Sequence, residues 1–150
     1  MAEALGPATL AYCDVAGFHP VASSAVELVP AGGSDMEGLL ARVSAEDADE
    51  SGLAEITSPA FVVRSGLDVI AAAGYRAWPG DTAHVSVLTV PAERGRGLAR
   101  VVATASVTHA LEAGLLPQWR ARLQASRRVA RALGFRELGS QLSIRLLRPV

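Results

Sequence analysis

The residues best suited to chemistry lie within 84–99, where an apolar strand runs into the turn Arg94-Gly95-Arg96-Gly97 and then into a helix. Glycine has no Cβ, so the backbone at the two glycines can turn sharply and let a ligand approach its N–H groups. The first N–H groups of the helix lack intrahelical partners and lie at the positive end of the helix dipole. The two arginines add positive charge beside them. This stretch therefore predicts a binding site for a phosphate group.

His84 lies at the start of the same strand, shortly after Asp81, and Glu93 lies in the turn. Imidazole exchanges protons near neutral pH, so His84 is the candidate general base. The alternative is a surface histidine at a strand start with no chemical role. No two of the three histidines have the spacing of metal ligands, and Cys13 is the only cysteine, so no metal site is predicted.

The composition indicates one globular domain. The chain has 150 residues, 50% of them hydrophobic, which is enough for one core. Its net charge of −1 does not favour nucleic acid or a membrane surface as a partner. All fourteen basic residues are arginine, a bias typical of a GC-rich bacterial genome.

No signal peptide and no run of ~18 apolar residues is found, and a lone cysteine excludes an internal disulfide. A cytoplasmic protein is therefore expected.

Turn-forming residues break the first 60 residues into short pieces. Strands are predicted at 9–12 and 25–29. A helix is predicted to follow Asp35 as its N-cap, because apolar residues recur after it at helical spacing. The acidic run 46–50 is interpreted as a solvated loop or a helix end.

The second half of the chain shows a clearer pattern of elements. Three strands separated by tight turns are typical of an antiparallel meander, with the ranges 61–64, 67–77 and 82–90. Helices and strands then alternate, with predicted ranges 97–113 (helix), 115–122 (strand), 126–133 (helix) and 141–147 (strand). Gly114 and Gly134 are expected to end the two helices, and a last hairpin is expected to turn near Gly139. This order predicts an α/β or α+β fold with a mixed sheet.

Two segments resemble the sequence signatures of the GNAT superfamily of N-acetyltransferases. The family pattern [Arg/Gln]-x-x-Gly-x-[Gly/Ala] after a strand appears here as Arg94, Gly97 and Ala99. The segment 126–135 resembles the family's Ser-x-x-x-Ala-x-x-Leu-Gly-Phe helix end. The resemblance covers 61–147 and is weak before it. It implies a single domain over 1–150 whose mostly antiparallel sheet is flanked by helices and opened by a splayed strand pair.

The resemblance also implies a cofactor site for acetyl-CoA, in a V-shaped gap between the strand 82–90 and the strand around Trp119. The pantetheine arm would pair with the backbone like an added strand. The pyrophosphate would lie on the N–H groups of the glycine turn, and Ser126 would either contact CoA or merely cap its helix. The implied cofactor-binding residues are Leu88, Val90, Arg94, Gly95, Arg96, Gly97, Leu98, Ala99 and Ser126.

For the acceptor, the resemblance implies direct attack of an amine, from a small molecule or a peptide, on the thioester. Tyr75, Trp78 and Trp119 could line the acceptor pocket, and core packing is the alternative for each. Two positions depart from the family. Many members carry Asn three residues before the helix serine, where this chain has Leu123. Many carry a tyrosine acid where this chain has Ala130.

These observations leave three hypotheses. The leading one is an N-acetyltransferase that transfers an acetyl group from acetyl-CoA to a primary amine. The alternative, motivated by the two departures, is a catalytically silent protein that binds acyl-CoA. The third is an arginine-rich nucleic-acid-binding module, against which the net charge argues; its arginines would be Arg120, Arg122, Arg127, Arg128 and Arg131. An exposed strand edge in the meander or the last hairpin could also pair two copies as a homodimer.

Overall fold

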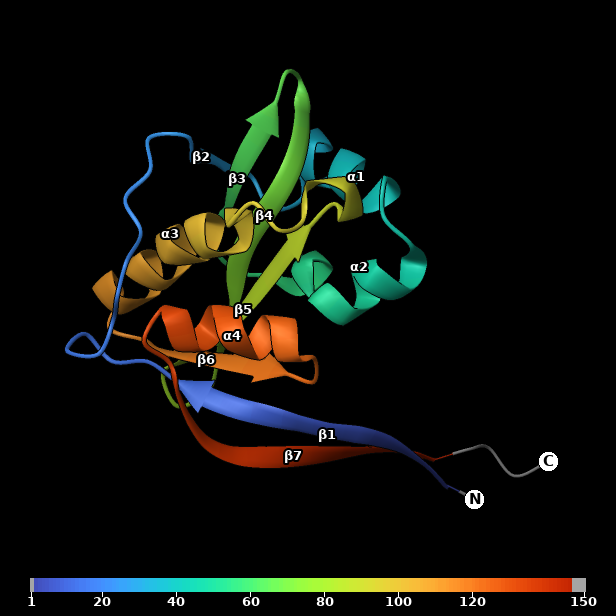
Figure 1. The fold of residues 1–150 in the computed structure, drawn as a ribbon, viewed down its shortest axis with the longest axis vertical. Coiled ribbons are helices and arrows are strands. Elements are labelled where there is room, and N and C mark those ends of the chain that lie inside the picture. Colours follow the sequence, from blue (N-terminus) through green and yellow to red (C-terminus); the bar gives the residue numbers. More distant parts are fainter. Residues whose placement is uncertain (1, 147–150) are drawn as a thin grey trace.

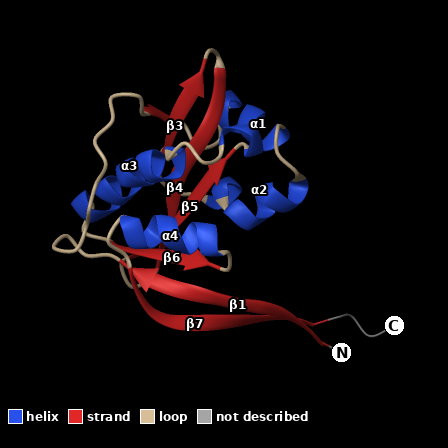
Figure 2. Cartoon of the chain, viewed as in Figure 1, coloured by secondary structure: helices blue, strands red, loops and turns tan. Residues whose placement is uncertain are grey.

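The computed structural model describes residues 2–146, with side chains placed for 8–139. Within this range the chain forms one mixed sheet flanked by helices (Figures 1 and 2). The strands are β1 (Ala2–Tyr12), β2 (Glu27–Val29), β3 (Ala60–Ser65), β4 (Asp68–Trp78), β5 (Thr82–Thr89), β6 (Leu116–Ala121) and β7 (Arg136–Leu146). The helices are α1 (Ser34–Ala41), α2 (Ala45–Ser51), α3 (Leu98–Glu112) and α4 (Gln124–Ala132), with 3₁₀ turns η1 (Leu53–Glu55) and η2 (Pro91–Glu93).

The strand order is β2-β3-β4-β5-β6-β1-β7. Every neighbouring pair is antiparallel except β5 and β6, which run parallel. The predicted mixed, mostly antiparallel sheet with flanking helices is therefore confirmed, as is the meander β3-β4-β5. The edge strands are β2 and β7, so, contrary to expectation, no strand of the meander lies at an edge, and a homodimer stays a prediction.

Apolar side chains cover the sheet on both faces. Successive residues of a strand point to opposite faces, so β5 contributes to two cores. Val85 packs in a cluster with α3 and α4, whereas Leu88 packs in a cluster with α1 and η1. None of the described helices has both the length and the apolar character needed to cross a membrane.

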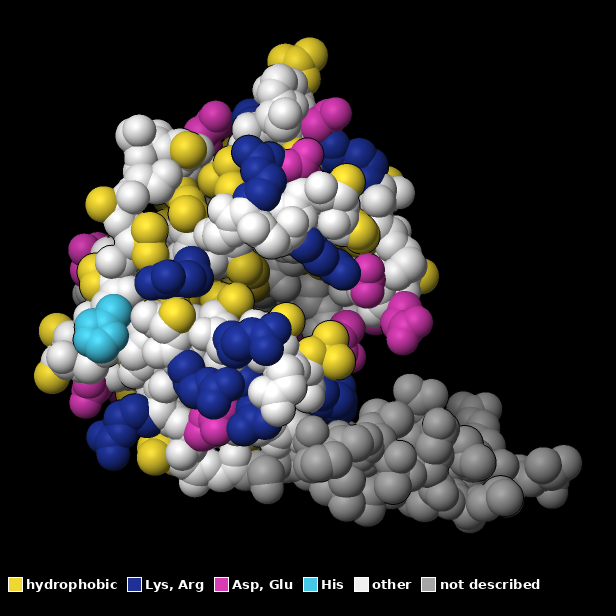
Figure 3. Space-filling model, viewed as in Figure 1, with side chains coloured by type: hydrophobic (Ala, Val, Ile, Leu, Met, Phe, Trp, Pro, Cys, Tyr) yellow, Lys and Arg dark blue, Asp and Glu magenta, His cyan; other side chains and the backbone are white. Residues whose placement is uncertain are grey.

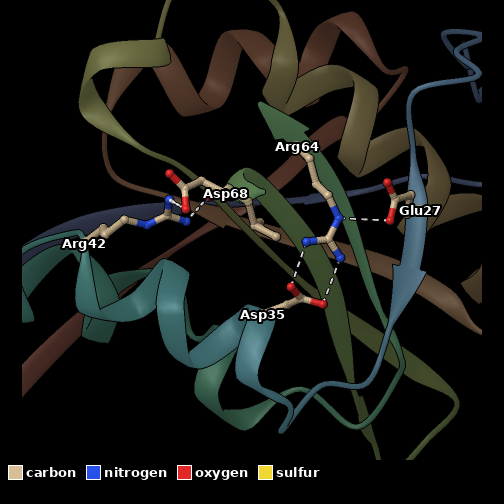
Figure 4. Close-up of polar contacts among 6 residues, drawn as sticks. Glu27, Asp35, Arg42, Arg64 and Asp68 are labelled. Atoms are coloured by element: carbon tan, nitrogen blue, oxygen red, sulfur yellow. Dashed lines mark hydrogen bonds and ion pairs between the residues drawn. The ribbon is translucent and has the colours of Figure 1, made fainter. Parts of the chain in front are cut away.

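The start of α1 differs from the prediction. Gly33 is the N-cap and makes no side-chain cap, whereas Asp35 lies inside the first turn. Figure 4 shows why: the Asp35 carboxylate accepts two hydrogen bonds from Arg64 on β3, at 2.7 and 2.8 Å. Arg64 also contacts Glu27 of β2 at 3.0 Å. One guanidinium thus joins α1 and β2 to β3.

The acidic run 46–50 is helical, which is more regular than the solvated loop or helix end expected for it. It forms most of α2, whose N-cap Ser44 accepts a hydrogen bond from the backbone N–H of Asp47 at 3.0 Å. Acidic residues in the first turn also interact favourably with the helix dipole.

The predicted last hairpin is wrong. No turn occurs near Gly139, because β7 continues from Arg136 to Leu146 and lies along β1 (Figure 1). The register shifts at this point: Leu10 lies opposite Gly139, but Ala11 lies opposite Glu137. One extra residue on β7 makes a bulge, and a glycine inside a strand often marks one. Gly139 therefore marks a local irregularity within a strand and not the turn of a hairpin.

Both helices predicted to end at glycine do so. After α4, Gly134 has φ of 99° and its N–H donates to Arg131 O, while Phe135 N–H donates to Ala130 O. This pair of bonds is a Schellman motif. The same pattern ends α3 at Gly114, with φ of 78°. A Cβ on Gly134 would lie 1.9 Å from the carbonyl oxygen of Gly17, so this end of α4 packs directly on the preceding loop.

Candidate functional site

A cleft of about 610 Å³ opens where β5 and β6 separate. Their parallel pairing begins at Thr82 opposite Leu116 and ends at His84 opposite Gln118, so beyond this pair the strands diverge. The cleft is lined by both strands, by α2, by the start of α4, and by the turn before α3. Near the centre of Figure 3 the surface is hollowed, with arginine side chains around the hollow. This is the place where the family resemblance implies a V-shaped gap.

The turn after β5 has the predicted conformation. Gly95 and Gly97 have φ of 82° and 76°, a region that side chains with a Cβ rarely adopt. Gly97 is the N-cap of α3 and provides no side-chain cap, so the first N–H groups of the helix have no such partner. A Cβ on either glycine would meet nothing within 4 Å, so both glycines border open space. The turn thus fits an anion held by backbone N–H groups.

Five of the six predicted turn residues line the cleft: Arg94, Gly95, Gly97, Leu98 and Ala99. Arg96 is not among the lining residues, and it pairs instead with Glu93. Leu88 also lines the cleft, whereas Val90 does not.

The resemblance implies that the pantetheine arm pairs near Leu88 and Val90, and the backbone direction on β5 shows which groups there face the cleft. The N–H of Val90 donates to Ile70 O at 2.9 Å, so it points toward β4. In an antiparallel pair, such bonded residues alternate with residues whose polar groups point the other way. Leu88 lies two residues before Val90, so its backbone N–H and C=O groups also point toward β4. The N–H and C=O groups of Val87 and Thr89 point the other way, toward the cleft. A strand-like ligand would therefore find its partners at Val87 and Thr89.

Acidic residues of α2 reach both walls of the cleft. Asp47 lies 3.4 Å from Arg94 of the glycine turn, and Glu50 lies 2.7 Å from Arg122 beyond β6. Desolvation by burial lowers the pKa of the neighbouring Arg120, with a further contribution from the charge of Arg122. The cleft is therefore a charged site of both signs, with arginines on both walls.

His84 lies at the narrow end of the cleft, at the last paired position of β5 and β6. Its Nδ1 is 3.1 Å from Oε1 of Gln118. The ring of Trp78 lies nearly perpendicular to the imidazole, with ring centroids 6.1 Å apart. Trp78 is 44% exposed, and the guanidinium of Arg76 lies 4.8 Å from its ring centroid. Trp78 is thus beside His84 but is not among the residues lining the cleft.

Tyr75 and Trp119 have different positions. Tyr75 is buried, lies outside the cleft, and its hydroxyl is 2.9 Å from Nδ1 of His109 on α3. Burial raises its pKa. This placement matches core packing, the alternative that the sequence left open for Tyr75. Trp119 is 5% exposed, lines the cleft, and donates from Nε1 to Oγ of Ser126 at 3.0 Å.

Ser126 lines the cleft but does not cap α4, because the N-cap residue is Leu123. Of its two expected roles, capping is thus excluded by the geometry. Ala130 is 2% exposed and packs in the core between α4 and the sheet. Leu123 and Ala130, the two departures from the family pattern, therefore bring no polar side chain to the cleft.

One residue beside the cleft, Gln118, was missed by the sequence analysis. It is the hydrogen-bond partner of His84. Alternation along β6 places Gln118 and Arg120 on the face opposite Trp119, a signal the sequence contains. The contribution of α2 carried no sequence signal. Within the described part of the chain, no group of three or more His, Cys, Asp or Glu could hold a metal ion.

Comparisons with known proteins agree with this geometry. The family model described as GNAT acetyltransferase matches residues 57–140. Among solved structures, a GNAT-family protein from Novosphingobium aromaticivorans has a TM-score of 0.72 at 22% identity, over 94% of this chain and 65% of that one. A GCN5-related N-acetyltransferase from Kribbella flavida has a TM-score of 0.71 at 14% identity, over 95% and 58%. No curated protein matches the chain.

The chain thus spans at most about two thirds of the length of these solved structures, which at such identities share its fold. The family model, by contrast, covers more than half of the chain, including β3 to β6, the glycine turn and α4. On this ground, the chain belongs to the GNAT acetyltransferase family.

Proposed function

We propose that the protein is an N-acetyltransferase that transfers an acetyl group from acetyl-CoA to a primary amine of an acceptor by direct attack. The observation that carries the proposal is the combination of a splayed parallel strand pair and an open glycine turn in one cleft. Membership of the GNAT acetyltransferase family supports the same reaction class.

For the cofactor, we propose that the pyrophosphate binds the backbone N–H groups of 94–99 at the start of α3, where the helix dipole favours an anion. The pantetheine arm pairs with the outward backbone groups of Val87 and Thr89. The Thr89 hydroxyl is buried and has no hydrogen-bond partner among the described residues, which supports a ligand there. Ser126 contacts CoA from the opposite wall.

For the chemistry, we propose that His84 takes the proton of the attacking amine. The amine nitrogen bonds to the thioester carbonyl carbon, the carbon–sulfur bond breaks, and CoA leaves as a thiol after protonation by water. His84 suits the role because it lies at the narrow end of the cleft, where the strands that would hold the two substrates meet.

The test is acetyl transfer itself. The full chain is incubated with acetyl-CoA and a panel of small amines, amino acids and short peptides. Release of CoA thiol that depends on one amine, with a product heavier by one acetyl group in mass spectrometry, is the expected result. Thiol release without an acetylated product would be hydrolysis and would contradict the proposal.

A second function is favoured by one observation. Leu123 and Ala130 put apolar side chains where many family members have polar ones, which is compatible with binding of acyl-CoA without turnover. The same panel distinguishes the two: tight binding of acetyl-CoA with no transfer to any amine would favour the silent protein.

A further inference from the structure

Three hydrogen-bonded polar side chains lie in a row across the sheet, at the narrow end of the cleft. Tyr12 of β1 lies opposite Gln118 of β6, and Gln118 lies opposite His84 of β5. Residues paired in register lie on the same face and contact one another. Gln118 therefore lies between a tyrosine and the candidate base.

The donors and acceptors in this row are given by the atoms that face one another. The amide Nε2 of Gln118 donates to Oη of Tyr12 at 2.9 Å, so its Oε1 is the atom that faces Nδ1 of His84, at 3.1 Å. With the amide in this orientation, its carbonyl oxygen accepts and Nδ1 carries the hydrogen. The neutral imidazole then has its lone pair on Nε2. Tyr12 is the second partner of the amide, on the side away from His84.

Of the three residues, the one that reaches the cleft is His84. His84 lines the cleft, whereas Gln118 and Tyr12 are not among its lining residues. The ring of Trp78, on β4, lies nearly perpendicular to the imidazole. A base needs an unprotonated nitrogen, and when Nδ1–H is held by Gln118, that nitrogen is Nε2.

We propose that Gln118 is a positioning residue that holds His84 in the Nδ1–H tautomer, with Tyr12 accepting a hydrogen bond from the Gln118 amide. The role of Gln118 in the reaction rests on the proposed function, in which His84 is the base. The tautomer itself does not, because it is argued from the hydrogen bonds of Gln118 and not from the reaction.

The direct test is nitrogen NMR of the histidine rings, at a pH where all three are neutral. The signals of His84 are assigned from a His84→Gln variant. We expect protonated Nδ1 and unprotonated Nε2 in the native protein. Gln118→Leu should move the population toward the Nε2–H tautomer, while Gln118→Glu, which retains an acceptor, should keep the hydrogen on Nδ1. Gln124→Leu is the matched control, because Gln124 is exposed on α4 and lies outside the cleft.

Two NMR results would overturn the proposal. One is a native His84 with its hydrogen mainly on Nε2. The other is a Gln118→Leu variant whose His84 signals match those of the native protein and of Gln124→Leu.

Kinetics test the consequence for the reaction. A typical hydrogen bond contributes about 1 kcal/mol, so Gln118→Leu should lower kcat about fivefold and leave KM for acetyl-CoA unchanged. Tyr12→Phe should cause a smaller loss of the same kind. An unchanged kcat in an active Gln118→Leu enzyme would overturn the catalytic part. If the native protein acetylated no amine, the proposed function would fail, while the NMR result would still decide the tautomer.

Discussion

Single residues at the cleft owe their roles to the face of the strand on which they lie. On β5, His84 and Leu88 share one face, and Val85 lies on the other, against α3 and α4. On β4 the same alternation turns Tyr75 toward His109 and away from the cleft. Residue type therefore indicates which groups could do chemistry, and strand register decides which of them reach the site.

His84→Gln tests the base directly. General bases contribute typically about 10²-fold or more, so kcat should fall by at least about that factor. Calorimetry should find acetyl-CoA affinity unchanged, because the proposed phosphate and pantetheine contacts lie farther along the cleft. A variant with the native rate at every pH would reject His84 as the base.

The glycine turn could be predicted at this scale, because a positive φ and an open N-terminus of a helix are local properties of Arg94 to Leu98. The position of Tyr75 could not. Its face depends on pairing with β5 and on α3 packing above it, and neither is visible in a run of residues around it. Gln118 was overlooked for the same reason, since its importance lies in a neighbour 34 residues away.

At the scale of elements, the ends of helices and the partners of strands determine the architecture. The ends of α3 and α4 are coded by single glycines and were predicted. The path of β7 was not, because the long pairing with β1 joins the two ends of the chain. A glycine predicts a turn or a bulge equally well, and only the presence of β1 as a partner selects the bulge.

The helix ends give a prediction about stability. Gly114→Ala should cost about 1 kcal/mol, because alanine is disfavoured at positive φ. Gly134→Ala should cost about 3 kcal/mol or more, since overpacking adds to the same strain. The added Cβ would lie 1.9 Å from Gly17 O, in a loop anchored by the bond from His19 N–H to Leu133 O at 2.8 Å.

Chemical denaturation of both variants measures the difference. The two glycines end their helices in the same motif, and Gly114 has nothing within 4 Å of an added Cβ, so it controls for the backbone strain. Equal losses of stability would show that the contact with Gly17 is readily relieved.

The link between α1, β2 and β3 gives a prediction about pH. Hydrogen bonds from Arg64 lower the pKa of Asp35 below its ordinary value. A carboxyl whose pKa is lower in the folded state stabilises the fold above its unfolded pKa, about 3.9, and this stabilisation is lost as the pH falls through the folded pKa. The Tm of Asp35→Asn should therefore be below that of the native protein at pH 7, and the gap should close in acid.

Thermal melts across acidic pH provide the measurement. Asp49→Asn, which changes an exposed carboxylate on α2, is the control and should show no such gap. A gap for Asp35→Asn that stays constant as the carboxyl becomes protonated would mean that the ion pair with Arg64 is not its cause.

At the scale of the whole molecule, one sheet draws strands from both ends of the chain and leaves one parallel pair, β5 and β6, to open the cleft. The class of fold followed from the order of elements and from the family resemblance. The strand order could not be predicted from spacing, because β1 enters between β6 and β7, over 100 residues away in sequence. The first 60 residues contribute α2, whose carboxylates reach both walls of the cleft.

Calorimetry tests most directly the proposal that this cleft binds acetyl-CoA at the glycine turn. We predict that the native protein binds acetyl-CoA and that Gly97→Val weakens binding at least tenfold, or about 1.4 kcal/mol, because valine disfavours the φ of 76° and fills the approach to the N–H groups. Gly80→Val is the matched control: its φ is 84°, an added Cβ also meets nothing within 4 Å, and it lies in the β4–β5 turn outside the cleft. No binding by the native protein, or equal affinity in the two variants, would contradict the account.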